Sequence, residues 1–265
     1  MGLQRINKSS GRHSELPTCA VVPSVTTILN AINKPALVPW AAKEERLLCL
    51  DRARALYERL PAGEKLAGEE FLRQLEAEIG FEKANKRAMQ KAADYGSAVH
   101  NYIEWHLKKE VGLDAGECPA LPAGGELSWK SYKKFRRVKK IHVRLIEAQA
   151  FSIKHGYAGT TDWVAVSRLL GRDVVGDWKT SKSMHEEQVL QAVAYVMALI
   201  ENGTLNPPVD AYVVRLPKES SNPELEVRHV TWEEMPPLFE TFLATKNVWH
   251  WQNPDWDAKH NTVAA

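Results

Sequence analysis

The segment that most constrains this chain spans residues 174–180 and has the sequence Val-Val-Gly-Asp-Trp-Lys-Thr. Its two β-branched residues predict a buried strand that runs into polar residues. Because side chains alternate between the faces of a strand, we expect Asp177 and Lys179 to point to the same side. An acid and a lysine at the mouth of an apolar strand cost free energy unless they bind something. A divalent cation and a phosphate suit this pair, and an exposed ion pair at a strand end is the alternative.

Two neighbouring segments add further polar groups. Residues 157–164 have a strand pattern with one acid, Asp162, for which a position in a turn is the alternative. Residues 188–200 predict an amphipathic helix, on which Gln191 and Tyr195 lie one turn apart. The alternative is that these two are ordinary helix residues without a role at the site. Carboxylates on two successive strands offer hard oxygen ligands for Mg²⁺ or Mn²⁺.

A helix is predicted over residues 94–109, where His100 and Glu104 are four residues apart and therefore share one face. His100 is either a metal ligand or a core histidine. For Glu104 a structural or supporting role is favoured over that of a ligand. Residues 142–153 predict a strand whose pattern puts Val143, Leu145, Glu147 and Gln149 on one face. Glu147 then lies near the other carboxylates or forms an ion pair with Arg144 or Lys139.

The helix predicted over residues 128–140 is strongly basic. Seven of the eleven residues from Lys130 to Lys140 are Lys or Arg, and Trp129, Tyr132 and Phe135 recur at helical spacing. Cations that follow phosphates and aromatic rings that stack on bases suit a nucleic-acid strand. Alternatively, the rings face the core while the charges are solvated, and both interpretations can hold together. The candidate DNA-binding residues are Lys130, Lys133, Lys134, Arg136, Arg137 and Lys140.

The order of the predicted elements is helices, three strands, a helix, two strands and a closing helix. This order predicts an α/β fold with a central mixed sheet of about five strands flanked by helices. We expect a flexible tail over residues 1–20, an N-terminal helical annex over residues 21–90, the sheet domain over residues 91–258 and a C-terminal tail over residues 259–265.

The composition excludes several classes of protein. The net charge of +2 does not indicate a polyanion partner for the molecule as a whole, so any basic surface is local. Cys19, Cys49 and Cys118 are far apart, which favours neither a disulfide framework nor a zinc site and fits a reducing compartment. No apolar run approaches the ~18 residues of a membrane span. We expect a cytoplasmic protein that does not act at a membrane, with a mitochondrial location as the less favoured alternative.

Four short motifs occur in a fixed order along the chain. They are Gly-Ser-Ala-Val-His-Asn-Tyr-Ile-Glu at 96–104, Gly-Thr-Thr-Asp at 159–162, Asp-Trp-Lys-Thr at 177–180 and Gln-x-x-x-Tyr at 191–195. Each is weak alone, but the ordered set, in an apolar context, resembles the PD-(D/E)XK nuclease superfamily in its RecB-like branch. The opening Pro-Ser-Val-Thr-Thr at 23–27 and Trp40-Ala41 also look like the phage and mitochondrial-genome-maintenance exonucleases of that branch. The resemblance covers roughly residues 21–200.

This resemblance implies a restriction-endonuclease-like core and a role for each motif residue. It implies that Mg²⁺ or Mn²⁺ is held by Asp162, Asp177, the carbonyl of Trp178 and His100. Lys179 would orient or deprotonate the nucleophile and neutralise developing charge. Three further sets of residues have roles around this centre. Glu147 matches an upstream acid of the family, Gln191 and Tyr195 would contact the scissile region or brace Lys179, and Ser24 and Thr26 are candidate DNA contacts.

The function that the resemblance implies is a metal-dependent DNA exonuclease acting on single strands or DNA ends in recombination, repair or phage replication. Recombination or replication proteins are the expected partners, in a bacterial or phage-infected cell. A structure-selective endonuclease and a catalytically silent DNA-binding module are the alternatives. Some relatives carry an iron–sulfur cluster on four cysteines, and three cysteines without that spacing argue against a cluster here.

Overall fold

The computed structural model describes residues 4–8, 11–16, 20–32, 34–60, 68–80, 83–218 and 222–260. By its internal contacts the chain divides into two units. Residues 1–32 and 96–265 form the sheet unit, and residues 33–95 form the helical unit. The candidate site residues all belong to the sheet unit.

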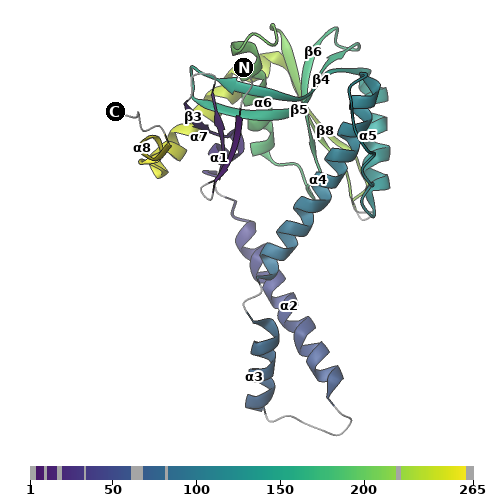
Figure 1. Ribbon diagram of the computed structural model, residues 1–265, viewed down its shortest axis with the longest axis vertical. Helices are drawn as coiled ribbons and strands as arrows, with labels where there is room; N and C mark the ends of the chain where they lie inside the picture. Colours follow the sequence, from purple (N-terminus) through teal and green to yellow (C-terminus); the bar gives the residue numbers. More distant parts are fainter. Residues whose placement is uncertain are drawn as a thin grey trace. The chain divides into compact units, whose positions relative to one another are not determined.

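In the described residues, the central sheet of this unit has five strands in the order β4-β5-β6-β7-β8 (Figure 1). The strands are β4 (Ile141–Ser152), β5 (Tyr157–Ser167), β6 (Arg172–Lys179), β7 (Val209–Arg215) and β8 (Glu226–Val230). Neighbouring strands are antiparallel except for β6 and β7, which run parallel. The parallel pair needs a crossover, and α6 (Glu186–Glu201) supplies it. The predicted fold class, a mixed five-stranded sheet flanked by helices, is confirmed.

One face of the sheet is covered by α6, α1 (Val25–Leu29) and α7 (Met235–Gln252). α6 can approach the strands closely because its sheet-facing residues include alanines, such as Ala194 and Ala198, which are fully buried. The hydroxyl of Tyr157 on β5 donates a hydrogen bond to the carbonyl of Ala194 at 3.0 Å. This bond satisfies the one polar atom of a buried ring and fixes α6 against β5.

The opposite face is covered by α5 (Gly125–Lys139), which lies beside the part of α4 (Ala84–Glu110) that follows Gly96 (Figure 1). Phe135 of α5 packs against Trp163, Trp178 and Tyr212 of the sheet at ring distances of 6.1, 5.6 and 5.4 Å. The predicted basic helix is therefore an amphipathic helix whose aromatic residues form core contacts.

The close approach of β5 and β6 requires a glycine at position 176. A Cβ atom there would lie 1.7 Å from the buried ring of Trp163. We expect Gly176→Ala to lower the free energy of unfolding by at least about 2 kcal/mol, because an overpacked core must shift its side chains or backbone. Thermal unfolding of Gly176→Ala and of Gly68→Ala measures this, since a Cβ at Gly68 meets no atom within 4 Å. Equal melting temperatures for the two variants would contradict the prediction.

The helical unit contains α2 (Leu37–Arg59), α3 (Gly68–Ile79) and the first turns of α4. Its buried apolar residues include Leu48, Leu56 and Leu75, and Arg59 of α2 pairs with Glu78 of α3 at 2.6 Å. The N-terminal helical region is thus as expected in type. By contacts it spans residues 33–95, whereas the sequence predicts an annex over residues 21–90, because α4 continues through the boundary as one helix.

The N-terminal residues differ from the prediction of an irregular tail over residues 1–20. β1 (Gln4–Lys8), β2 (Gly11–Glu15) and β3 (Val21–Pro23) form an antiparallel sheet. The polar sequences of β1 and β2 hide these strands, which are defined by backbone pairing of β1 with β2 and of β2 with β3. At the other end, α8 (Trp256–His260) extends into the predicted C-terminal tail, and residues 261–265 lie outside the described residues.

Cys19 lies outside the described residues. Among the helices that the structure describes, none combines the length and the apolarity needed to cross a membrane.

Candidate functional site

The C-terminal end of β6 carries the central pair of the site. Asp177 and Lys179 lie on the same side of the strand as Val175, whose side chain packs in the core on the α6 face. They form an ion pair, and their side chains are 6% and 19% exposed. The alternation that predicts a common side for these two residues therefore holds, but the pair is buried beneath α6 rather than exposed at a strand end.

Asp162 on β5 joins this pair to helix α4. Its Oδ2 accepts a hydrogen bond from the backbone N–H of Trp178 at 2.6 Å, and its Oδ1 lies 3.3 Å from Nδ1 of His100. Gly96, the first residue of the motif that contains His100, allows α4 to approach the end of β6. A Cβ at Gly96 would lie 2.9 Å from the hydroxyl of Thr180, so a larger residue would push α4 away from the end of β6.

Helix α6 completes the site with a chain of hydrogen bonds. Lys179 donates from Nζ to Oε1 of Gln191 at 2.8 Å, and Nε2 of Gln191 donates to the hydroxyl of Tyr195 at 2.8 Å. A Cβ at Gly159 would lie 2.5 Å from the Tyr195 ring, so this glycine makes room for Tyr195. Gln191 and Tyr195 therefore fix the position of the lysine ammonium group. Gly96 and Gly159 have this supporting role, and their places within the motifs are the sequence signal for it.

The charges of the site shift the pKa values of its acids in opposite directions. Burial raises the pKa of Asp177, and the nearby charge of Asp162 adds to this effect against the opposing ammonium of Lys179. Burial also acts to raise the pKa of Asp162, but His100, Lys179 and the Trp178 N–H outweigh it and lower that pKa. Burial acts to lower the pKa of His100, but Asp162 and Asp177 outweigh it and raise the pKa to about 9. The site therefore attracts positive charge.

The side chains fit a hard divalent cation in part. Asp162 and Asp177 provide the oxygen ligands that Mg²⁺ and Mn²⁺ prefer. The buried Oδ2 of Asp177 pairs with the ammonium of Lys179, and an ionised carboxylate has further acceptor sites on its two oxygens that a cation can use. Over the described ranges, however, no three His, Cys, Asp or Glu side chains form a ready-made metal cluster. A cation would therefore depend on these two carboxylates together with backbone or water oxygens.

Glu147 lies opposite Asp162 in the register of β4 against β5, between the pairs Ile146–Trp163 and Ala148–Thr161. Its side chain is exposed, its φ angle is +50°, and its charge acts on Lys108 of α4. The sequence predicts one face for Val143, Leu145 and Glu147, but Val143 is buried and Leu145 is exposed. The register of β4 against β5 shifts between Val143 and Leu145, and such a bulge reverses the faces that follow it.

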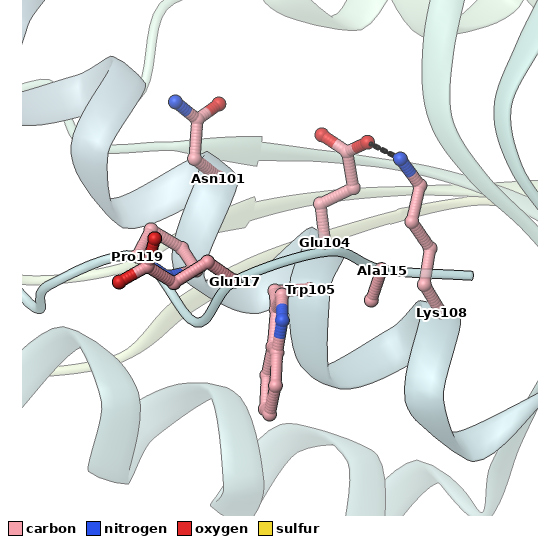
Figure 2. Close-up of a pocket in the computed structure, with 7 residues that line it drawn as sticks. All are labelled: Asn101, Glu104, Trp105, Lys108, Ala115, Glu117 and Pro119. Carbon is pink, nitrogen blue, oxygen red and sulfur yellow. Dashed lines mark ion pairs between the residues drawn. The ribbon is translucent and has the colours of Figure 1, made fainter. Parts of the chain in front are cut away.

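The structure also shows the ion pairs of Arg144 and Glu104. Arg144, one candidate partner of Glu147, pairs with Asp173 at 2.7 Å. Glu104 forms an ion pair with Lys108 at 2.6 Å, one turn further along α4, which agrees with a structural role. Figure 2 shows this pair beside a pocket of about 280 Å³, which α4 forms with residues 115–119.

The remaining candidate DNA-binding residues fall into two groups. Ser24 caps α1 by accepting a hydrogen bond from the N–H of Thr27 at 3.1 Å, and its hydroxyl also lies 2.9 Å from that of Thr26. Their hydroxyls thus take part in helix capping. On α5, Arg136 donates two hydrogen bonds to the carboxylate of Glu110, at 2.5 and 2.8 Å, and is largely withdrawn from solvent. The exposed cations are Lys130, Lys133, Lys134, Arg137 and Lys140.

Sequence comparison assigns no family: no protein-family model matches the chain, and no curated protein matches it significantly. Among solved structures, the crystal structure of an alkaline exonuclease from Laribacter hongkongensis aligns with 63% of this chain and 98% of its own. The two are 8% identical, with a TM-score of 0.28.

Proposed function

We propose that this protein is a metal-dependent nuclease that hydrolyses phosphodiester bonds in DNA. The observation that carries the proposal is the buried group of Asp162, Asp177 and Lys179, in which α6 holds the lysine through Gln191. Two acids and a lysine withdrawn from water are costly to bury and are useful to a reaction that builds negative charge on a phosphate. The order of the four sequence motifs supports the same reaction.

The residues would divide the work of hydrolysis. A divalent cation held by Asp162 and Asp177 would supply positive charge for the phosphate and acidify water. Lys179, fixed by Gln191, would orient the nucleophile and hold its ammonium against charge that develops on the phosphate oxygens. His100 and the N–H of Trp178 would keep the Asp162 carboxylate in one orientation.

The finer proposal is an exonuclease on single strands or DNA ends, working with recombination or replication proteins in repair, recombination or phage replication. It rests on the likeness of the sequence motifs to the RecB-like branch. A catalytically silent DNA-binding module is disfavoured because such a module has no use for the Lys179–Gln191–Tyr195 hydrogen-bond chain.

The test uses end-labelled single- and double-stranded DNA, with covalently closed circles as matched substrates, in the presence of Mg²⁺, Mn²⁺ or EDTA. We expect cleavage with either cation, none in EDTA, and resistance of the closed circles. Cleavage of closed circles would favour the endonuclease alternative. Cleavage in EDTA, or none under any condition, would overturn the proposal.

His100→Gln is expected to weaken the apparent affinity for Mn²⁺ by about 10- to 100-fold, because the imidazole holds a carboxylate ligand in place. The variant should lose only the stability of the His100–Asp162 pair, which is present at neutral pH because the pKa of His100 is raised to about 9. Metal titration of activity, compared with the melting temperature, measures both effects. An unchanged titration with a large drop in melting temperature would show that His100 is a core residue.

Arg136 and Arg137 are adjacent in sequence but are expected to differ in role. Arg137→Gln should weaken DNA binding and reduce the slope of log K against log salt by about 0.7, the value for one phosphate contact on a single strand. Arg136→Gln should instead lower the melting temperature, because it breaks the half-buried pair with Glu110. Salt titration of binding and thermal unfolding of both variants measure this contrast. An unchanged salt slope for Arg137→Gln would show that this face of α5 is only solvated.

A further inference from the structure

A second pocket, of about 470 Å³, lies between the N-terminal half of α5 and the segment that precedes β8. It is lined by Leu127, Lys130, Ser131, Lys134, Pro223, Glu224 and Leu225. We propose that this pocket holds one unpaired nucleotide of a single-stranded substrate. The proposal rests on the proposed nuclease function. It adds a substrate preference to that function, because such a pocket selects single strands over intact duplex.

The pocket lies at the same end of the sheet as the candidate active site. Lys179 is the last residue of β6, and its carbonyl accepts a hydrogen bond from the N–H of Leu216, just after β7, at 2.7 Å. Pro217 follows Leu216, and its carbonyl accepts a hydrogen bond from the hydroxyl of Ser128 on α5 at 2.8 Å. Ser128 is one residue from the pocket residue Leu127. The start of α5 therefore lies at the end of the sheet where β6 finishes with Lys179.

The wall of the pocket is held by a buried arginine. Arg215, the register partner of Lys179 on β7, is 2% exposed. Its guanidinium donates to the carbonyl of Glu224 at 2.6 Å and to Asn222 at 3.2 Å, and it pairs with Glu226 at 2.9 Å. Residues 222–226 are thereby fixed on both sides of Pro223 and Leu225, so the pocket is formed before any ligand arrives.

The same segment is also tied to the loop that follows Lys179. The side-chain amide of Asn222 donates to the carbonyl of Lys182 at 3.3 Å. The chain between the strand of Lys179 and the helix of Gln191 is thus linked to the pocket wall. A DNA strand bound in the pocket would be held by the same part of the protein that positions Lys179.

The lining matches the chemistry of a nucleotide with an unpaired base. Lys130 and Lys134 are exposed and one helical turn apart, so their ammonium groups can meet the phosphates on either side of one sugar. Leu127, Pro223 and Leu225 offer apolar surface for the face of a base, and Glu224 offers a carboxylate acceptor for a base amino group. In a duplex the base faces are stacked inside, so a duplex can use the lysines but not the apolar floor.

The test measures binding of labelled oligonucleotides by fluorescence anisotropy in EDTA, which separates it from cleavage. The probes are a single strand with bases, an abasic strand of equal length and the matching duplex. We expect the wild type to bind the base-bearing strand roughly fivefold more tightly than the abasic strand, as burial of a modest apolar area predicts. Leu225→Ser should remove this preference, whereas the matched control Leu169→Ser, an exposed leucine in the turn between β5 and β6, should keep it.

The lysine rim is tested separately from the floor. The double variant Lys130→Gln/Lys134→Gln should weaken binding of all probes and reduce the salt slope by about 1.4, two contacts at ~0.7 each. The control Lys154→Gln/Arg168→Gln removes the same charge from exposed positions outside the pocket and should leave the slope unchanged. Melting temperatures check the fold of each variant, and Leu127→Ser replaces Leu225→Ser if the latter unfolds.

Three results would overturn the pocket assignment while leaving the nuclease proposal intact. The first is equal affinity of the wild type for base-bearing and abasic strands, and the second is a base preference that survives in both floor variants. The third is failure of the wild type to bind any of the three probes. Metal-dependent cleavage, measured on its own, decides the nuclease proposal.

Discussion

Asp177→Asn is expected to abolish cleavage and at the same time to stabilise the fold at neutral pH. The loss of activity should be at least about a thousandfold, because the carboxylate is one of two that can hold the cation. The gain in stability follows from its raised pKa, whose main cause is burial. A carboxylate held above its ordinary value of 3.8 contributes stability below that pH and loses it as the pH rises through the folded-state pKa. A neutral amide carries no charge at any pH, so it avoids the cost that burial places on an ionised carboxylate at this position.

Asp162→Asn should be equally inactive but less stable than the wild type. The pKa of Asp162 is lowered below 3.8 by His100 and its hydrogen bonds, against the opposing effect of burial. Its contribution to stability is therefore present above that value and lost as the pH falls through the folded-state pKa. The amide forfeits this contribution at neutral pH, so the two inactive variants should shift the melting temperature in opposite directions.

A third acid on the same side of β6 provides the control for both variants. Asp173 pairs with Arg144 outside the site, so Asp173→Asn should retain activity. Cleavage assays and melting curves at pH 7 and pH 4 measure the effects. Activity within tenfold of the wild type in either site variant would contradict the site assignment. Destabilisation of both variants by equal amounts would contradict the opposite pKa shifts.

Some features of the site follow from the sequence alone, whereas the opposite pKa shifts of Asp162 and Asp177 do not. The common side of Asp177 and Lys179 follows from strand alternation, and the spacing of Gln191 and Tyr195 follows from the helical repeat. Both are local rules, and the structure obeys both. The opposite pKa shifts of the two acids depend on burial by α6 and α4 and on His100 of α4, which lies against Asp162. Both effects depend on contacts between residues far apart in the chain.

The misplaced residues have non-local causes as well. Glu147 leaves the expected face because one bulge in β4 reverses the alternation after Val143. The N-terminal hairpin is not predicted from the sequence because its polar strands are defined by their pairing with each other and by the pairing of β2 with β3. On α5, periodicity predicts which residues are buried, but only the position of Glu110 on another helix shows that Arg136 is withdrawn from solvent.

Arg215 shows the limit of sequence reasoning most clearly. A single arginine at the end of an apolar strand carries no local signal, since such a residue is usually exposed. Its burial becomes intelligible only from the segment that folds back over it and from its register beside Lys179.

Lys179→Met is expected to lower kcat by about 100- to 1,000-fold and to leave KM for DNA within about threefold of the wild type. The ammonium lies beside Asp177, and Gln191 fixes it, so it is placed for charge that develops only in the transition state. An interaction made only there appears in kcat and not in KM. Methionine keeps the length of the side chain and removes its charge, so the change isolates the electrostatic contribution.

The control for this last prediction is the residue that positions the lysine. Gln191→Leu should lower kcat by a smaller factor, on the order of tenfold, because the ammonium remains but loses one of its hydrogen bonds. Single-turnover kinetics with saturating enzyme, together with DNA binding in EDTA, separate the chemical step from docking. A raised KM with an unchanged kcat in Lys179→Met would make Lys179 a docking residue. A larger defect in Gln191→Leu than in Lys179→Met would transfer the central role to the amide and show that the lysine serves chiefly to balance the buried charge of Asp177.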